Sequence, residues 1–454
     1  MTWLKPALAY LPQWFDYRVA QLGLPGASLA VAQGGKVALA HATGVANLST
    51  SEKLTPSHRY RFASHSKTFT ATGVMKLVEQ GRLRLDDKVG QHVEGLHRDV
   101  AAATIAQLLS HTSGITRDGE DTGQWSDRRP FLDEADLRAA LAEAQPIPAN
   151  TRMKYSNHAF GLAGLVIAAV TGEPYNTWIA REIVAKSGLG HTYPDAPLPK
   201  GIPFARGHSS PALLGSRFVI PSDNCTNALA AATGFVSTPS DLARFYGSLD
   251  PEAKLSVISV ASRREMIRAH WPIIGSHPPR QYGLGTARVD IGDWTLIGHG
   301  GGFQGVRTKT AFVMGENLSL SVAIHAADGE PQGMLESAAR ILQTFKRLGP
   351  AGKRTADWSG RYWSLWGAAD IVPFANRVMV AQPGMADPFA DASELTLTGP
   401  DEARITAAGG YGSYGQGARL VRDRKGKVIE VIVAGGRLIT QAAAAKEAKE
   451  RYGA

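Results

Sequence analysis

The sequence of 454 residues contains a single cysteine, Cys225. An intrachain disulfide is therefore excluded, and the cysteine content gives no indication of an oxidising compartment. No neighbouring pattern supports Cys225 as a nucleophile, so we expect a small structural side chain. The start of the chain lacks a basic segment followed by a long apolar core, and no run of about 18 apolar residues occurs. We expect no signal peptide, no membrane span and a cytoplasmic location.

The formal net charge of +9 is not gathered into one strongly basic patch. Basic residues come closest to a run at 419–427 and 446–451, and both runs are interrupted, so we expect no nucleic-acid partner. The sequence also lacks a His-x-x-x-His pattern, clustered carboxylates and a glycine-rich phosphate loop. These absences predict an activity that needs neither a metal nor a cofactor.

The order of the expected elements favours an α+β fold. Two short apolar runs on either side of Gly34-Gly35 predict a hairpin. Strand patterns return over 284–325, and an amphipathic helix is expected over 331–348. We expect one antiparallel sheet built from both ends of the domain and flanked by terminal helices, with an all-α subdomain over about 68–270 inserted between them.

The length predicts one large domain and one smaller domain, which we place at 1–349 and 350–454. An apolar stripe over 3–22 predicts an N-terminal helix, which Pro12 should interrupt or begin. Short alternating segments at a spacing of about ten residues over 358–441 predict a small β-barrel in the second domain.

Ser64 and Lys67 lie three residues apart, directly before a helical pattern over 68–82. At that spacing the two side chains share one face of a helix. A hydroxyl beside an amine can serve as nucleophile and proton acceptor, and the positive end of the helix dipole favours the neutral, basic form of the amine. An N-cap serine with an ordinary surface lysine is the alternative. The intervening His65 and Ser66 are expected to make packing contacts.

Tyr155-Ser156-Asn157 precedes a second helical pattern. The phenol of Tyr155 can exchange a proton with the Ser64 oxygen or a leaving group if a neighbouring ammonium lowers its pKa. The Asn157 amide can hold Lys67 and a substrate carbonyl. A core tyrosine followed by a helix-capping asparagine is the alternative for this segment.

Gly298-His299-Gly300-Gly301-Gly302 stands at the end of an expected strand. Glycines such as Gly300 and Gly301 let a substrate lie along the strand edge and leave backbone N–H groups free to bind an oxyanion. His299 can bind a carboxylate or assist proton transfer, whereas a glycine turn with a surface histidine is the alternative. Candidate aromatic walls of a substrate cleft, equally compatible with core positions, are Trp125, Trp271, Tyr282 and Phe303.

Six segments in a fixed order resemble the β-lactamase-related serine hydrolases, a group that includes class C β-lactamases, DD-carboxypeptidases, D-aminopeptidases and esterases. The resemblance covers roughly 20–348, and His111 in its second segment is expected to stabilise a loop by hydrogen bonds. The segments are Phe-Ala-Ser-His-Ser-Lys (62–67), Leu-Leu-Ser-His-Thr-Ser-Gly (108–114), Tyr-Ser-Asn (155–157), Ala-Thr-Gly-Phe-Val-Ser-Thr-Pro-Ser-Asp-Leu (232–242), Tyr-Gly-Leu-Gly (282–285) and His-Gly-Gly-Gly (299–302). His299 replaces the lysine of the Lys-Thr-Gly motif of class A β-lactamases, as in the esterase and D-aminopeptidase members, which argues against true β-lactamase activity.

The resemblance implies that Ser64 is acylated and that Lys67 and Tyr155 form the proton-transfer pair. Asn157 would position Lys67 or the substrate, and His299 would stand where the cation of the third motif lies. The implied oxyanion hole consists of the backbone N–H groups of Ser64 and Gly302. The β-rich C-terminal segment resembles the lipocalin-like domains appended to some members.

We therefore expect a serine acyl-transfer hydrolase that acts on esters or amides of a small molecule or peptide, with peptides or amides containing D-amino acids as the leading class. A penicillin-binding-protein-type thioesterase or peptide cyclase, in which an amine replaces water, stays open. A non-catalytic protein that binds a ligand in its barrel is the alternative of a different class, and the intact Ser64, Lys67, Tyr155 and Asn157 argue against it. The sequence leaves the oligomeric state open, a homo-oligomer included.

Overall fold

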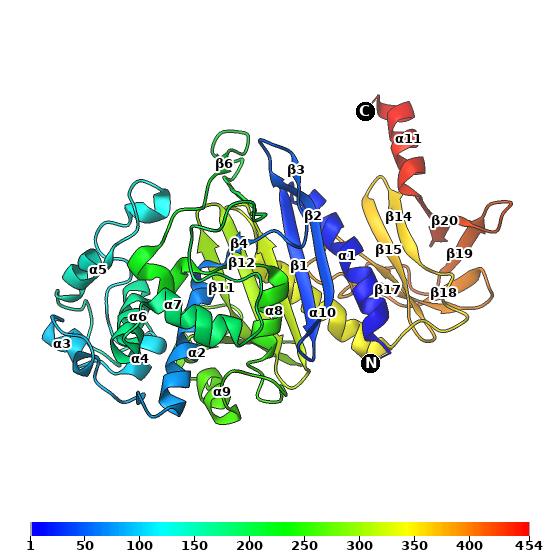
Figure 1. Ribbon diagram of the computed structural model, residues 1–454. Helices are drawn as coiled ribbons and strands as arrows, with labels where there is room; N and C mark the ends of the chain where they lie inside the picture. The colour runs from blue at the N-terminus through cyan, green and yellow to red at the C-terminus, as the bar shows by residue number, and fades with distance from the viewer. Residues whose placement is uncertain (1, 454) are drawn as a thin grey trace. The chain divides into compact units, whose positions relative to one another are not determined.

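The computed structural model describes residues 2–453, which divide into two compact units. One unit is Gly23–Leu335, and the other combines the residues up to Leu22 with those from Glu336 onward. Figure 1 shows the order of the elements along the chain. The expected domain boundary between 349 and 350 stays a prediction.

The first unit is built on a nine-stranded sheet in the order β3-β2-β1-β13-β12-β11-β10-β9-β8, with antiparallel neighbours throughout. Strand β1 pairs with β13, with Leu29 opposite Val322, so the early hairpin and the late strands form one sheet as predicted. The strands are β1 (Gly26–Gln33), β2 (Lys36–Asn47), β3 (Glu52–Lys53), β8 (Trp271–Ile273), β9 (Arg280–Tyr282), β10 (Ala287–Ile291), β11 (Trp294–Phe303), β12 (Val306–Val313) and β13 (Leu318–Ile324).

The segment between β3 and β8 supplies the helices that lie beside this sheet in Figure 1, which confirms the predicted α+β arrangement. They are α2 (Ser66–Glu79), α3 (Arg98–Ala101), α4 (Ile105–Leu109), α5 (Glu134–Leu141), α6 (Asn157–Thr171), α7 (Tyr175–Ile179), α8 (Pro239–Gly247) and α9 (Val260–Ile267). Two short strand pairs interrupt the segment, β4 (Tyr60–Arg61) with β7 (Val236–Ser237) and β5 (Gly207–His208) with β6 (Val219–Ile220).

Helix α2 is the central helix of this unit, because almost all of its first twelve residues are buried. Phe69 is fully buried, and its ring stacks on Phe235 at 4.1 Å and on Phe245 at 3.8 Å between centroids. At the start of the helix, the Ser66 hydroxyl donates to the Ala63 carbonyl at 2.6 Å and accepts from the Phe235 N–H at 2.9 Å. These contacts fix the turn that carries Ser64.

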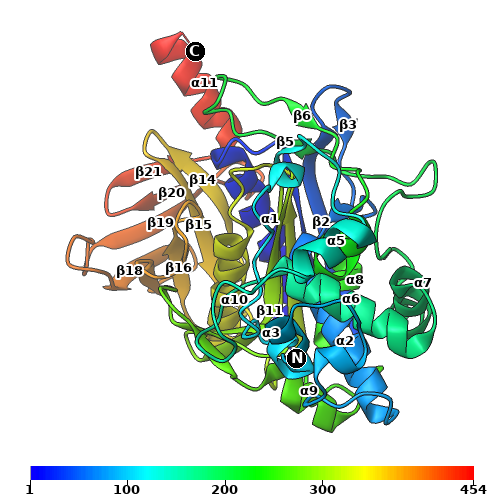
Figure 2. The same ribbon diagram turned by 90° about the vertical axis from the view of Figure 1, so that its left-hand side faces the viewer.

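The second unit contains α1 (Leu4–Gln21), most of α10 (Pro331–Leu348) and a closed barrel of eight antiparallel strands, so the expected C-terminal barrel is confirmed. Figure 2 labels β14–β16 and β18–β21 among these strands. The strands are β14 (Gly360–Ser364), β15 (Gly367–Pro373), β16 (Val378–Ala381), β17 (Ser393–Leu397), β18 (Glu402–Ala407), β19 (Gly417–Arg422), β20 (Val428–Val433) and β21 (Gly436–Ile439).

Helix α1 begins at Leu4 and continues through Pro12, so the prediction that Pro12 interrupts the helix or begins it is wrong. Proline removes one backbone hydrogen bond, but Leu11, Trp14 and Phe15 next to it are fully buried. Burial of three large apolar side chains outweighs one lost hydrogen bond, because each contributes about 1.5–3 kcal/mol.

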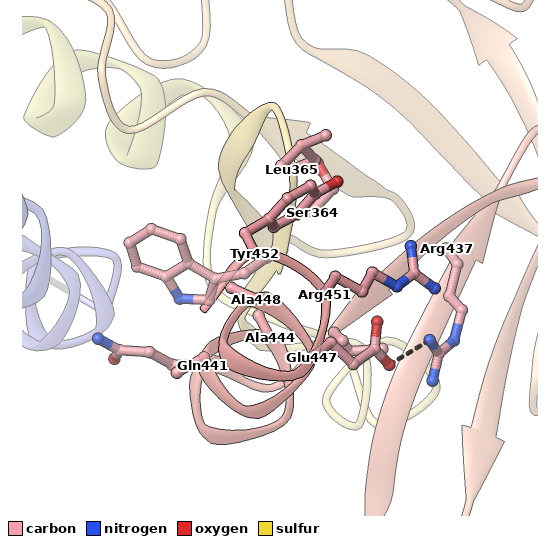
Figure 3. Close-up of a pocket in the computed structure, with 12 residues that line it drawn as sticks. Ser364, Leu365, Arg437, Gln441, Ala444, Glu447, Ala448, Arg451 and Tyr452 are labelled. Carbon is pink, nitrogen blue, oxygen red and sulfur yellow. Dashed lines mark hydrogen bonds and ion pairs between the residues drawn. The ribbon is translucent and has the colours of Figure 1, made fainter. Parts of the chain in front are cut away.

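The barrel interior is filled by apolar side chains, among them Trp358, Ile371, Leu395 and Val431. Outside the strands, α11 (Gln441–Tyr452) buries none of its residues. Residues of α11, β14 and β21 line a pocket of about 530 Å³, and an ion pair of 2.7 Å between Arg437 and Glu447 joins the helix to the barrel (Figure 3). Among residues 2–453, no helix combines the length and the apolar character needed to cross a membrane.

We predict that Phe69→Ala destabilises the first unit by about 3–5 kcal/mol, because it removes a fully buried ring stacked between two others. Chemical denaturation followed by tryptophan fluorescence measures this loss. Phe218→Ala is the matched control, since that ring is 43% exposed, and it should change stability by less than about 0.5 kcal/mol. Equal destabilisation by the two substitutions would show that the stacked aromatic core does not support α2.

Candidate active site

The predicted site residues converge on one cleft of about 910 Å³ in the first unit. Its lining includes Ser64, Trp125, Tyr155, Asn157, His299, Gly300, Gly301, Gly302 and Phe303. Lys67 is fully buried beneath this surface and reaches Ser64 from below. The structure therefore brings together the residues that the sequence singled out as site candidates, with the exception of Trp271.

Ser64 lies in a 3-10 turn, Ala63–His65, that leads directly into α2. Ala63 has φ of +49°, a left-handed conformation that costs energy for any residue with a side chain. The Ser64 Oγ lies 2.7 Å from the Tyr155 hydroxyl and 3.2 Å from Lys67 Nζ. The nucleophile candidate thus contacts both proposed proton-transfer groups at once.

The Lys67 amine has two acceptors in addition to Ser64. Its Nζ donates to Asn157 Oδ1 at 2.7 Å and to the Ala232 carbonyl at 2.8 Å. Burial holds the pKa of Lys67 well below its ordinary value, although Asp118 acts in the opposite direction. A neutral amine has two N–H groups, which these acceptors take, and one lone pair. In that neutral form the lone pair faces the Ser64 hydroxyl 3.2 Å away, which places Lys67 as the base.

Tyr155 lies between Lys67 and the cleft, with Lys67 Nζ 4.6 Å from the centre of its ring. Burial raises the pKa of its phenol above the ordinary value, and the opposing effects of the Ser64 hydrogen bond and of Arg117 are smaller. The lowered pKa that would make Tyr155 a base is therefore absent from the resting site. Tyr155 is a neutral phenol there and donates its proton to Ser64 Oγ at 2.7 Å.

Asn157 connects Lys67 to a residue that the sequence analysis did not single out. Its Nδ2 donates to Asp118 Oδ1 at 2.7 Å, while Asp118 Oδ2 accepts from Arg117 Nε at 3.0 Å. Both residues lie in a polar loop that gave no motif. The Ala232 carbonyl was equally unassigned, although it opens one of the six ordered segments. A backbone carbonyl has no signature of its own in a sequence.

His111 is a buried histidine that supports the aromatic side of the cleft. His111 Nδ1 accepts from the Ser156 N–H at 3.1 Å, and its ring lies 4.2 Å from that of Tyr155. His111 therefore stabilises its loop by a hydrogen bond, as expected, and also packs on the phenol. Ser156 in turn caps α6, because its Oγ accepts from the Ala159 N–H at 2.9 Å.

His299 uses both ring nitrogens within the protein. The Tyr282 hydroxyl lies 2.8 Å from Nε2, and Nδ1 lies 2.6 Å from the Gly300 carbonyl. Since a carbonyl only accepts, Nδ1 carries the proton and Nε2 accepts from Tyr282. Burial, reinforced by Lys67, lowers the pKa of His299 well below its ordinary value. His299 is thus a neutral imidazole in the resting site, and its proposed roles in binding or proton transfer stay predictions.

The three glycines that follow His299 on β11 differ in how much room each has for a side chain. A Cβ on Gly301 would lie 2.1 Å from the Phe62 carbonyl oxygen, so only glycine lets β11 approach the turn before Ser64 this closely. Added Cβ atoms on Gly300 and Gly302 would meet nothing closer than 3.5 Å and 3.7 Å. Those two positions line the cleft, and an added Cβ there would make only ordinary van der Waals contacts. The oxyanion hole assigned to the N–H groups of Ser64 and Gly302 stays a prediction.

Three of the four aromatic candidates line the cleft, and the fourth does not. Trp125 and Phe303 line the cleft with their rings 6.2 Å apart, and the Arg61 guanidinium lies 4.6 Å from the Phe303 ring centre. Tyr282 lines the cleft as well, whereas Trp271 on β8 is not part of the lining that the described residues form.

The neighbours of the nucleophile make packing contacts. His65 is fully buried against the Phe62 and Tyr246 rings, and burial lowers its pKa to about 3. Cys225 is half-buried, and burial raises the pKa of its thiol. Within residues 2–453, no group of three or more His, Cys, Asp or Glu side chains is arranged to hold a metal ion.

Comparison with known proteins gives a match to the family model described as Beta-lactamase over residues 11–346. Protein flp of Staphylococcus aureus (strain MRSA252) is 31% identical over 173 residues, which cover 37% of this chain and 34% of flp. The match therefore spans about a third of the length of that relative.

Solved structures match over a longer range. The octameric penicillin-binding protein homologue from Pyrococcus abyssi has a TM-score of 0.66 at 21% identity, covering 95% of this chain and 99% of the homologue. The D-amino acid amidase from Ochrobactrum anthropi SV3, complexed with L-phenylalanine amide, has a TM-score of 0.64 at 25% identity, covering 75% of this chain and 99% of the amidase. The first match extends the common fold over both units.

We predict that Asp118→Asn moves the acidic limb of the pH–rate profile to lower pH. The Asp118 carboxylate raises the pKa of Lys67, so its removal lowers that pKa further and the amine stays neutral at lower pH. The rate of Ser64 modification by a fluorophosphonate, measured against pH, reports this limb. Asp121→Asn is the matched control in the same loop, because Asp121 pairs with Arg129 at 2.9 Å, and it should leave the limb in place. A limb displaced to higher pH in the Asp118 variant would contradict Lys67 as the base.

Proposed function

The chain belongs to the beta-lactamase family, and we propose that it is a serine hydrolase that cleaves amides or esters of D-amino acids through an acyl-enzyme at Ser64. One observation carries this proposal. The Ser64 oxygen lies within hydrogen-bond distance of both a buried amine with a lowered pKa and a phenol that carries its proton. A retired site would be under no constraint to keep this three-residue geometry.

In the proposed acylation, the Ser64 hydroxyl proton passes to Lys67 Nζ while Oγ attacks the substrate carbonyl carbon. The carbonyl π electrons move to its oxygen, which accepts from the N–H groups of Ser64 and Gly302. As the tetrahedral intermediate collapses, the leaving group takes the proton of Tyr155, and the Lys67 ammonium returns a proton to the phenol. Water then attacks the acyl-enzyme by the same steps in reverse order and releases Ser64.

The preference for D-amino acid derivatives is supported by the amidase from Ochrobactrum anthropi SV3, whose structure the first unit matches. Within the cleft, the free edge of β11 beyond its pairing with β10 is available to an extended substrate, because β10 pairs with β11 only as far as Gly298. The wall formed by Trp125 and Phe303 offers an apolar surface to a side chain.

A ligand-binding role for the barrel is less well supported, because its interior is occupied by its own apolar side chains. Hydrolysis and peptide cyclisation share the same acyl-enzyme and differ in whether water or an amine resolves it. Mass spectrometry of the products from a linear peptide thioester separates the two: a hydrolysed acid supports the proposal, and a cyclic product contradicts it.

We predict that a fluorophosphonate probe labels Ser64 covalently and that Ser64→Ala abolishes the label. Peptide mapping by mass spectrometry identifies the modified residue. Ser57→Ala is the control, because Ser57 is an exposed serine that does not line the cleft. That variant should still be labelled at Ser64 if it folds, and an adduct at any other residue of the wild type would refute the acyl-enzyme.

We predict that Tyr155→Phe lowers kcat by about 10²–10⁴-fold on a D-aminoacyl p-nitroanilide, because the proton donor to the leaving group is lost. Phenylalanine keeps the ring contacts with His111 and Lys67, so the site keeps its shape. The loss should be smaller on an activated p-nitrophenyl ester, whose leaving group departs without a proton. Turnover of both substrates near the wild-type rate would remove Tyr155 from the mechanism.

A further inference from the structure

The carbonyl that accepts from Lys67 belongs to an unusual turn. Ala232 lies in a π-helical turn, Ala230–Gly234, and such turns are rare and are frequent at functional sites. Two consecutive carbonyls of this turn accept from α2: Thr70 Oγ1 donates to Ala231 at 2.6 Å, and Lys67 Nζ donates to Ala232 at 2.8 Å. Lys67 and Thr70 are three residues apart, so one face of α2 holds two neighbouring peptide groups.

The hydroxyl of Thr70 is fully buried, and its neighbours determine where its proton points. Its Oγ1 lies 2.7 Å from the Tyr175 hydroxyl and 2.6 Å from the Ala231 carbonyl. The Ser66 carbonyl, in the same helix, is farther away at 3.0 Å. Since both carbonyls only accept and Thr70 has one proton, the shorter contact assigns that proton to Ala231. Tyr175, a phenol whose pKa is raised by burial, then donates to Thr70.

The π-helical turn lies between α2 and α6 and is held at its far end by other groups. A Cβ added to Gly164 of α6 would lie 2.8 Å from the Ala231 Cβ, so the absence of a side chain on Gly164 lets the turn pack this closely. The Gly234 carbonyl accepts from Arg61 at 2.5 Å, and the Phe235 N–H that follows donates to Ser66 Oγ at 2.9 Å. Thr70 is therefore the side chain that fixes the peptide group next to the Ala232 carbonyl.

The direction of the Ala232 carbonyl matters most when Lys67 is protonated. An ammonium has three N–H groups, and the acceptors within reach of Nζ are Ser64 Oγ, Asn157 Oδ1 and the Ala232 carbonyl. A neutral amine needs only two of them. Because hydrogen bonds from a charged donor are the stronger ones, the Ala232 carbonyl stabilises the ammonium more than the amine.

We infer that the Tyr175 and Thr70 hydroxyls are a positioning pair for the base: they hold the Ala231 peptide group so that the Ala232 carbonyl stays directed at Lys67 while the amine gains its proton. The inference rests on the proposed function, in which Lys67 takes the proton of Ser64. Neither hydroxyl belongs to the cleft lining that the described residues form, so the pair acts through the turn and not on the substrate.

Thr70→Val tests the inference, because valine replaces the hydroxyl by a methyl group of similar size. The Ala231 carbonyl then loses its donor, and the turn no longer directs Ala232 at Lys67. The ammonium is disfavoured and the pKa of Lys67 falls further, so the acidic limb of the pH–rate profile should move to lower pH. The plateau rate should fall by about 10-fold, because a hydrogen bond to the forming charge is weakened. The measurement is the rate of Ser64 modification by a fluorophosphonate against pH.

The pH dependence must come from Lys67 and not from its charged neighbours. The Thr70 hydroxyl contacts none of these neighbours within residues 2–453, so its loss leaves their own contacts in place. The titratable and charged groups that face Lys67 are Tyr155, Asp118, Arg117, His65, His111 and His299.

Three further variants separate positioning from a general loss of stability. Thr72→Val is the matched control, since Thr72 is fully buried in the same helix but donates to the Thr68 carbonyl of that helix at 2.8 Å, and it should leave the limb in place. Thr70→Ser keeps the hydroxyl and should restore the limb and the plateau. Tyr175→Phe frees Thr70 to donate to Ser66 instead, so it should give a smaller displacement in the same direction.

A limb that stays in place or moves to higher pH in Thr70→Val would overturn the inference, as would an equal displacement in Thr72→Val. If circular dichroism shows that Thr70→Val does not fold, the limb of Tyr175→Phe decides in the same way. Absence of Ser64 labelling in the wild type would refute the proposed function itself, whereas labelling with the same limb in every variant would refute the positioning pair alone.

Discussion

The site depends on the complete burial of one amine. Lys67 has no exposed surface, and its Nζ is fixed by Asn157, the Ala232 carbonyl and Ser64. Desolvation disfavours the ammonium and lowers the pKa of Lys67, so the neutral, basic form of the amine is easier to reach than in an exposed lysine. The surrounding structure maintains this burial: α2 is packed on the Phe235 and Phe245 rings, and the Ser66 hydroxyl ties its first turn to the segment that supplies Ala232. The packing of the aromatic core therefore maintains the burial of Lys67 on which the proposed chemistry depends.

The ionisable side chains around the site differ in burial and therefore in the charge that they favour. Burial lowers the pKa values of Lys67 and His299, which disfavours a positive charge on either side chain. At the surface, Arg117 packs on the Tyr155 ring and stays solvent-exposed, so water stabilises its charge.

Sequence reasoning located the parts of the site that have a chemical signature. Ser64, Lys67, Tyr155 and Asn157 stand in recognisable spacings, and the hairpin at Gly34-Gly35 together with the late strands gave the sheet. Asp118, Arg117 and the Ala232 carbonyl were missed, because an acidic residue in a polar loop looks like any solvated charge and a carbonyl has no residue type. The break expected at Pro12 failed for a related reason: a local rule cannot weigh the burial of Trp14 and Phe15, which tertiary packing decides.

The amide of Asn157 explains how a carboxylate can lie in the same network as a lysine whose pKa is lowered by burial. Asp118 does not touch Lys67; Asn157 stands between them, donating to Asp118 from Nδ2 and accepting from Lys67 at Oδ1. A carboxylate in direct contact with the amine would stabilise the ammonium and cancel the effect of burial, because an ion pair favours the charged forms of both partners. The intervening amide orients the Lys67 amine, because its Nδ2 can only donate to Asp118 and its Oδ1 can only accept from Lys67. It also keeps the negative charge of Asp118 one residue farther from the amine. Asn157 is therefore a spacer that lets the acid orient the base without protonating it.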